Sequence, residues 1–395
     1  MFGKFFNNKS EKRKSSMRQP ESDTACHTNN SQPSDLSILE IKQVIEETLK
    51  SYQSKNFPQG VYSVCSDLII NTDKANEILV SLTMPFPCHG ELDSIATSLT
   101  ERLKCVVNFM VNLNINAVRS FSLNGSGNNV KNIIAIASGK GGVGKSTTAV
   151  NIAYALIAEG AKVGILDADI YGPSIPTLLG LKMAKPSSDD GKLMIPLEAH
   201  GLYAMSIGFL VDEADATVWR GPMASGAFNQ LLNETAWPEL DYLIIDMPPG
   251  TGDIQLTLAQ KVPVAASVIV TTPQDIALID AVKGIAMFDK VQVPVLGVIE
   301  NMSYHLCENC GHKSHIFGEA GGEQMAKLKQ TQLLGQLPLD INIRQEADFG
   351  QSSVIENSAG EIACLYRRIA RNIAGQLFLQ LDNASPLTAT IEYTD

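Results

Sequence analysis

The sequence is poor in cysteine and has no long apolar segment. Seven cysteines in 395 residues do not suggest a disulfide scaffold and are typical of a reducing compartment. No apolar run reaches the roughly 18–20 residues that a transmembrane helix needs. Residues 1–18 are basic but lack the apolar core of a secretory signal. We therefore expect a cytoplasmic protein with no membrane partner, and a mitochondrial presequence is the alternative.

The chain also lacks an excess of positive charge. It has 31 Lys and Arg against 42 Asp and Glu, a formal net charge of −11, so overall charge does not favour binding to nucleic acid. A hydrophobic content of 44% and a charged content of 18% are typical of a globular chain. The length is enough for two or three domains.

The pattern along the chain divides it into five parts. We expect a disordered polar tail, a small α+β domain, a Gly- and Asn-rich linker, an α/β domain and a carboxyl-terminal tail. Their ranges are 1–35, 36–118, 119–131, 132–380 and 381–395. Within the small domain, periodicity predicts helices over 39–49 and 92–103 and strands over 61–70, 76–84 and 106–113.

The α/β domain alternates short apolar runs with helical patterns. The apolar runs cover 133–137, 163–166, 242–245, 266–271 and 295–299. Fully apolar strands separated by helices predict a mostly parallel sheet sandwiched by helices. Ligands of such sheets bind at the carboxyl ends of the strands.

A glycine-rich loop follows the first apolar run and opens a helical pattern. Its sequence, Gly139-Lys-Gly-Gly-Val-Gly-Lys-Ser146, is the P-loop pattern of ATP-binding proteins. Backbone N–H groups of such a loop point at phosphate oxygens, and the helix N-terminus adds partial positive charge. We expect Lys145 to contact the β- and γ-phosphates and the Ser146 hydroxyl to bind Mg²⁺. The predicted phosphate-binding residues are Gly139, Lys140, Gly141, Gly142, Val143, Gly144, Lys145, Ser146 and Thr147.

Carboxylates follow two more of the predicted strands. Asp167 and Asp169 close the run 163–166, and Asp246 closes the run 242–245 and precedes Met-Pro-Pro-Gly250. Asp246 is expected to hold Mg²⁺ through water. Gly250 can offer its N–H to the γ-phosphate, and its conformational freedom would let this segment move after hydrolysis.

The P-loop contains a second lysine, Lys140, that phosphate binding does not require. The loop resembles the deviant Walker A class, which includes cell-division positioning, plasmid-partition, arsenite-pump and nitrogenase iron-protein ATPases. In that class the early lysine reaches across a dimer to the partner's nucleotide. The resemblance implies a homodimer in which Lys140 and Lys145 are catalytic. It also implies that Asp169 orients the attacking water and that Asp167 supports the metal shell.

A close cysteine pair, Cys307 and Cys310, follows the last predicted strand. Together with His312 and His315 it could hold zinc within one chain, although the spacing is shorter than that of common zinc fingers. The pair could also cycle between a dithiol and a disulfide. Such motifs normally lie at the start of a helix, and Gly311 disfavours a helix here.

A third interpretation treats the pair as half of a site. A [4Fe–4S] cluster usually takes four thiolates, and a two-fold dimer would bring two pairs together on its axis. This interpretation needs the same dimer as Lys140 does, and we favour it. A zinc ion bridging four thiolates would have the same geometry.

The motifs taken together resemble those of the Mrp-type (ApbC) iron–sulfur cluster carrier ATPases. The resemblance rests on residues 131–180 with the P-loop, Val218–Met223, Asp246–Thr257, Thr271–Asp275, Glu300–Ser303 and Cys307–Cys310. It implies a homodimer that holds a [4Fe–4S] cluster between subunits, receives it from assembly scaffolds and passes it to apo-proteins. ATP binding and hydrolysis would be coupled to this transfer. Asn301 and Pro273 would lie near the adenine.

The amino-terminal domain resembles the PaaD/SufT-like iron–sulfur assembly module, with weaker agreement. The Asp-Pro-Glu-Leu stretch of that family is replaced by Asn56-Phe-Pro-Gln59, and Cys88 falls near the reactive cysteine of the module. A buried apolar role for Cys88 is an equal alternative.

Two other function classes remain open from the residues. One is a nucleotide-switched positioning ATPase of the partition or division type. Against a membrane helix of that kind, residues 381–395 have three acidic and no basic side chains. The other is an electron donor like the nitrogenase iron protein, whose cluster ligands come from two separated positions rather than one close pair.

Overall fold

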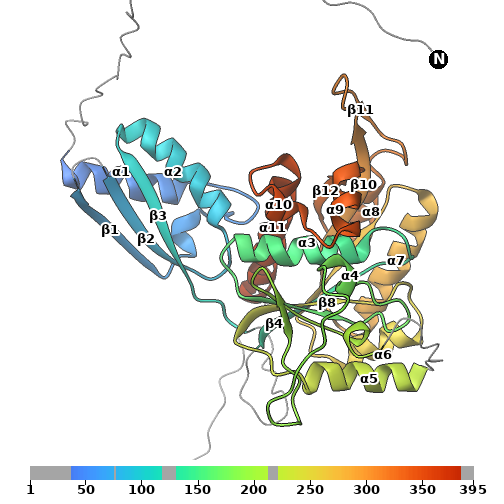
Figure 1. Ribbon diagram of the computed structural model, residues 1–395. Helices are drawn as coiled ribbons and strands as arrows, with labels where there is room; N and C mark the ends of the chain where they lie inside the picture. The colour runs from blue at the N-terminus through green and yellow to red at the C-terminus, as the bar shows by residue number, and fades with distance from the viewer. Residues whose placement is uncertain (1–36, 75–76, 118–129, 212–220, 384–395) are drawn as a thin grey trace, which may run out of the picture.

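The computed structural model describes residues 37–74, 77–117, 130–211 and 221–383 (Figure 1). The predicted amino-terminal tail, most of the predicted linker and most of the predicted carboxyl-terminal tail lie outside these ranges, as does the first half of the Val218–Met223 motif. Within them, a small α+β body precedes a larger α/β body. The predicted fold class is confirmed.

The small body packs two helices on a three-stranded sheet. Its elements are α1 (Ile38–Ser51), the 3₁₀ turn η1 (Val61–Ser63), β1 (Asp67–Lys74), β2 (Glu77–Met84), α2 (His89–Leu103) and β3 (Val106–Leu113). β1 and β2 are antiparallel and β2 and β3 are parallel. Alternate residues of β2 are buried, as its sequence predicts.

The predicted strand over 61–70 is wrong in its first half. Gly60 has φ of 89°, and the N–H of Val64 donates to the carbonyl of Val61, so the chain turns here. Val61 is buried by this turn. A buried β-branched residue therefore belongs to a turn, and the strand begins at Asp67.

The larger body is a parallel sheet between helices. Its strands are β4 (Val130–Ala137), β5 (Val163–Asp167), β6 (Leu197–Ala199), β7 (Leu202–Ser206), β8 (Leu240–Asp246), β9 (Ala266–Thr271), β10 (Val295–Leu306), β11 (Lys313–Ser314) and β12 (Leu333–Pro338). Its helices are α3 (Lys145–Ala158), α4 (Ile175–Leu178), α5 (Gly221–Asn233), α6 (Asp253–Lys261), α7 (Asp275–Lys290), α8 (Gly321–Leu328), α9 (Ile341–Asp348), α10 (Ser353–Glu356) and α11 (Glu361–Asn383), with the 3₁₀ turn η2 (Ile207–Phe209).

Among the described residues the sheet has the strand order β11-β10-β9-β4-β8-β5-β7-β6, with β12 beside β10. Every pair is parallel except β6–β7 and β10–β11. Because β4, β5 and β8 are central and parallel, their carboxyl ends meet at one edge. The P-loop, Asp167 and Asp246 follow these ends.

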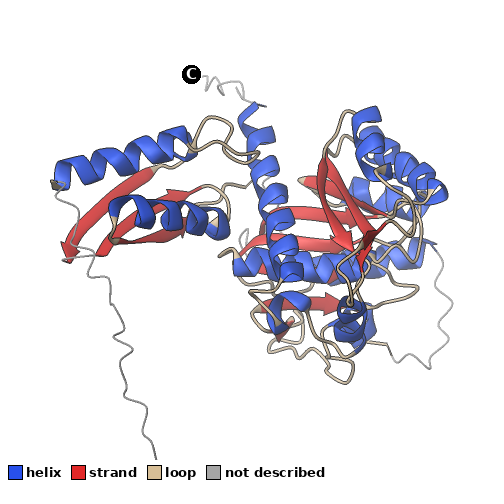
Figure 2. Cartoon of the chain, turned by 90° about the horizontal axis from the view of Figure 1, so that it is seen from above, coloured by secondary structure: helices blue, strands red, loops and turns tan. Residues whose placement is uncertain are grey.

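The long helix α11 lies between the two bodies (Figure 2). Its Phe378 ring lies 5.5 Å from that of Phe86, and Asn372 accepts a hydrogen bond from Asn56 at 3.3 Å. The P-loop helix α3 also reaches the junction, because Glu159, which follows its last residue, accepts a hydrogen bond from the N–H of Gly90 in the small body at 2.8 Å. The small body is therefore packed against the end of the helix that begins at the phosphate loop.

Candidate nucleotide and cluster site

The P-loop is a tight turn between β4 and α3. Gly144 has φ of 80° and precedes Lys145, the first residue of α3. A side chain at Gly139 would collide with the backbone of Asp280, and one at Gly144 would collide with the Asn301 side chain. Glycine is thus required at both ends of the loop by close packing, and at Gly144 also by its positive φ.

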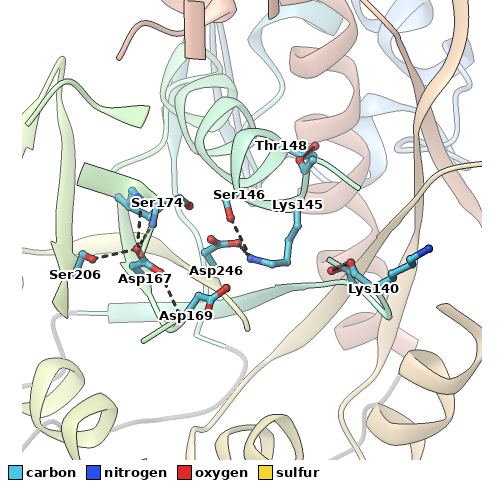
Figure 3. A network of polar contacts seen from close by, with 12 residues as sticks. Lys140, Lys145, Ser146, Thr148, Asp167, Asp169, Ser174, Ser206 and Asp246 are labelled. Atoms are coloured by element: carbon cyan, nitrogen blue, oxygen red, sulfur yellow. Dashed lines mark hydrogen bonds and ion pairs between the residues drawn. The ribbon is translucent and has the colours of Figure 1, made fainter. Parts of the chain in front are cut away.

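Lys145 reaches from the start of α3 into a buried acidic cluster (Figure 3). Its ammonium group is ion-paired with Asp246 and donates to the Ser146 hydroxyl at 3.1 Å. Lys145 is only 6% exposed, and Asp246 is fully buried. The second carboxylate oxygen of Asp246 is buried without a hydrogen-bond partner. A buried acceptor of this kind is costly, and a cation beside Ser146 and Asp246 would satisfy it, so these residues fit Mg²⁺.

Asp167 shapes the turn that follows β5. Its carboxylate accepts hydrogen bonds from the N–H groups of Asp169, Ser174 and Ile175 at 3.1–3.2 Å and from the Ser206 hydroxyl at 3.0 Å. Burial and the neighbouring Asp246 raise its pKa to about 7. The contribution of Ser206 is not predicted from the sequence, because β7 is not among the predicted strands.

Asp169 and Lys140 lie at the open side of the site. Asp169 is half-buried, and burial raises its pKa. Lys140 is exposed, and Figure 3 shows its ammonium group pointing away from Lys145 and Asp246. Gly250 has φ of 102°, and its N–H donates to the carbonyl of Ser138 at 2.9 Å. This N–H must break its hydrogen bond to Ser138 before it can donate to a phosphate oxygen.

A cavity of about 570 Å³ adjoins the P-loop. Its lining includes Thr147, Asn301, Met302, His305, Leu339 and Ile343. The Asn301 amide donates to the carbonyl of Val143 at 2.9 Å, so this side chain lies against the P-loop. Pro273 does not line this cavity and instead packs near Gly318 and Gly321. The size and apolar lining suit a nucleotide base.

The cysteine pair lies in the tip of the β10–β11 hairpin. His305 pairs with Ser314 and Leu306 with Lys313, and the loop between them projects beyond the sheet (Figure 1). Cys310 is exposed and Cys307 partly so. The N–H groups of Cys310 and Asn309 lower the pKa of the Cys307 thiol. The pair does not open a helix, so the setting expected for a dithiol of the thioredoxin kind is absent here.

The described part of the chain has no group of three or more His, Cys, Asp or Glu side chains that could hold a metal. His315 hydrogen-bonds through Nδ1 to the carbonyl of Ser303 at 3.0 Å, and its Nε2 lies 3.7 Å from Glu319. The interpretation with two cysteines and two histidines around one zinc is therefore wrong for the single chain. Two thiols remain at the tip as possible ligands.

Cys88 has the environment of a buried apolar residue. It is fully buried at the start of α2, and burial raises the pKa of its thiol. Reactive thiols are typically exposed and have lowered pKa values. The geometry thus favours the packing role over the transfer role. The resemblance of residues 36–118 to an assembly module stays a prediction.

Comparison with known proteins places the larger body in a family. Residues 129–374 match the family model described as ParA, NUBPL iron-transfer P-loop NTPase, well over half of the chain. The chain belongs to this family. The P-loop assignment made from the motif is thereby confirmed, as is the predicted family.

Curated proteins similar to this NUBPL-family chain have names that refer to the carriage or transfer of iron–sulfur clusters. The "Iron-sulfur cluster carrier protein" of Escherichia coli strain K12 is 55% identical over 306 residues, covering 76% of this chain and 83% of the relative. The mouse "Iron-sulfur cluster transfer protein NUBPL" is 49% identical over 250 residues, covering 63% and 78%. A nucleotide-binding protein from Archaeoglobus fulgidus, solved in complex with ADP, is 37% identical with a TM-score of 0.53, covering 60% and 93%.

None of the helices in the described ranges combines the length and the apolar character that a membrane-spanning helix requires.

Proposed function

We propose that this protein is an ATP-hydrolysing carrier that holds a [4Fe–4S] cluster between two copies of itself. It receives the cluster from an assembly scaffold and passes it to apo-proteins in the cytoplasm. Relatives named as cluster carriers support the cargo. All six described cysteines are free, which agrees with a reducing compartment.

The turn that contains Cys307 and Cys310, called the cysteine turn below, is the observation that carries this proposal. Cys307 and Cys310 lie at an exposed hairpin tip, and no third ligand from the described residues accompanies them. Two thiolates do not complete a cluster that needs four. A two-fold axis through the tip of the hairpin would supply the other two. The exposed Lys140 fits the same assembly, since it points away from its own acidic cluster.

The nucleotide roles follow from the buried cluster around α3. Lys145 would exchange Asp246 for phosphate oxygens, and the P-loop N–H groups would hold the remaining phosphate charge. Ser146 and Asp246 would hold Mg²⁺, which supplies positive charge beside the β- and γ-phosphates. Asp169 would orient the attacking water, and Asn301 would position the base.

The shared strand β10 gives a structural basis for coupling. Asn301 contacts the P-loop, His305 lines the base cavity and Cys307 starts the cysteine turn. All three belong to, or directly follow, β10. Nucleotide binding would therefore act on the strand that carries the cysteines.

The proposal is tested by anaerobic reconstitution with iron and sulfide. We expect one [4Fe–4S] cluster per two chains, seen by absorption and by iron, sulfide and zinc analysis. Cys307→Ser with Cys310→Ser should lose the cluster. The matched control, Cys65→Ser with Cys364→Ser, should keep it, because these cysteines lie outside the turn.

Two results would overturn the proposal. The first is iron and sulfide bound at full stoichiometry in the Cys307/Cys310 double variant. The second is zinc as the bound metal in protein isolated without added iron, which would make the dimer zinc-bridged.

A further inference from the structure

A second concave site lies where the two bodies meet beside the cysteine hairpin. This cleft has a volume of about 640 Å³. The small body, the middle of α11 and strands β10 to β12 all contribute to it. Neither the P-loop nor the base cavity shares its lining residues. The nucleotide site therefore does not account for it.

The rim of the cleft is positively charged on a protein that is negative overall. Lys55, Lys313 and Arg368 are exposed and come from the loop after α1, from β11 and from α11. No carboxylate of the described residues lies within ion-pair distance of any of them. Lys313 lies 4.1 Å from the centre of the Tyr304 ring. Against a net charge of −11, three uncompensated cations around one opening form a local anion-attracting surface.

The floor of the cleft has the opposite character. Glu91 is only 8% exposed, and it accepts hydrogen bonds from Tyr52 at 3.2 Å and from Asn56 at 3.0 Å. Arg371, also in the lining, is ion-paired with Glu159. A compact anion such as phosphate would meet the Glu91 carboxylate at the bottom. The rim cations come from three separate segments of the chain, so carboxylates spread along an extended segment match them better than one compact anion does.

The cleft adjoins the cysteine turn. Lys313 pairs with Leu306, and the preceding His312 accepts a hydrogen bond from the N–H of Cys307 at 3.0 Å. A segment bound at Lys313 would thus lie next to the proposed cluster.

We propose that this cleft is a docking site for an acidic peptide segment of a partner protein. The segment's carboxylates pair with Lys55, Lys313 and Arg368, and the partner is thereby held beside the cysteine turn. Because docking of a partner would be a step in cluster transfer, this role rests on the proposed function.

The test uses the full chain and a fluorescein-labelled peptide of alternating Asp and Ser, followed by fluorescence anisotropy. A peptide of alternating Asn and Ser is the uncharged control. We expect the acidic peptide alone to bind, with an affinity that falls as salt is added. Lys313→Glu with Arg368→Glu should weaken binding at least about tenfold, since two rim contacts become repulsive. Lys55→Glu alone should weaken it less.

The matched control is Lys182→Glu with Lys290→Glu, two exposed lysines outside the cleft. It makes the same charge change and should leave peptide binding within about twofold, since distant surface charges are screened. Equal losses in the control and cleft variants would refute the docking site. So would displacement of the peptide by inorganic phosphate at low millimolar concentration, because that result indicates a compact anion site.

Cluster assembly is measured on the same proteins. If the wild-type chain binds the acidic peptide at the cleft but assembles no cluster, the proposed function fails and the docking site stands. If it assembles a cluster but does not bind the peptide, the docking site fails and the proposed function stands. The cleft variant should assemble the cluster normally and transfer it more slowly to an apo-protein with an acidic surface segment.

Discussion

Glu159 provides the sharpest test of how the two bodies are joined. Its carboxylate accepts hydrogen bonds from Arg367 and Arg371 of α11, both at 2.7 Å, and from the N–H of Gly90 at 2.8 Å. Its carbonyl lies 2.6 Å from Nδ1 of His89, which must carry the proton because a carbonyl only accepts. The residue is fully buried at the carboxyl end of α3, where the helix dipole disfavours a negative charge.

Removing this charge should be costly. Glu159→Gln leaves two arginines, 22% and 15% exposed, without their anion. Breaking a buried pair in this way costs about 3–5 kcal/mol. An exposed pair at the same distance serves as the control: Arg344 and Asp348 are 2.7 Å apart but 63% and 58% exposed. Asp348→Asn should cost only about 0–1 kcal/mol, so burial rather than distance decides the difference.

The assay is urea unfolding followed by circular dichroism. With a denaturant slope of about 3 kcal/mol/M, a loss of 3 kcal/mol lowers the midpoint by about 1 M. Limited proteolysis should also cut the segment between the two bodies faster in Glu159→Gln. Midpoints within error of each other for Glu159→Gln and Asp348→Asn would refute the reasoning, because the junction would then be no stronger than a surface pair.

Three further substitutions test the nucleotide site and the small body. Lys145→Ala should weaken ATP binding roughly 10- to 150-fold, which is equivalent to losing a charge-assisted hydrogen bond of about 1.5–3 kcal/mol. Calorimetry measures the ATP affinity, and unchanged turnover would contradict the phosphate-site assignment. Asp169→Ala should bind ATP normally but hydrolyse it roughly 10²- to 10⁴-fold more slowly, whereas a matching loss of binding would make its role structural. Cys88→Ser should destabilise the fold by about 1–3 kcal/mol, since it buries a hydroxyl, and leave cluster transfer intact; lost transfer at unchanged stability would show that the thiol acts in transfer.

The sequence predicts most accurately those strands whose residues are all buried or are buried at alternate positions. The strands over 266–271 and 106–113 have the predicted bounds. Such strands show their burial directly as apolar or alternating residues. The P-loop and the acids of β5 and β8 were equally visible, because phosphate chemistry constrains both residue type and spacing.

The second half of β10 could not be predicted in this way. The apolar run ends at Ile299, yet the strand continues to Leu306. Glu300 is fully buried there because Ser303, Gln336 and the N–H of Gly322 satisfy its carboxylate. Two of these partners lie more than 20 residues away, so local polarity indicates a loop. For the same reason the cavity beside the P-loop is not predicted, since His305 and Leu339 meet only in the folded chain.

This unpredicted half-strand is also where the two parts of the site meet. Between Asn301 and Cys307, Met302 has φ of 54°, and the pairing with β12 shifts, so the strand bulges. A side chain in the left-handed region costs roughly 1–2 kcal/mol. The fold retains it because Glu300 is anchored before the bulge, and the carbonyl of Tyr304 accepts from the Leu339 N–H at 2.6 Å after it. We therefore expect a change at the P-loop to reach the cysteine turn through this bent strand, because the pairing of β10 with β12 is interrupted between Glu300 and Tyr304, whereas β4 and β8 pair without a register shift.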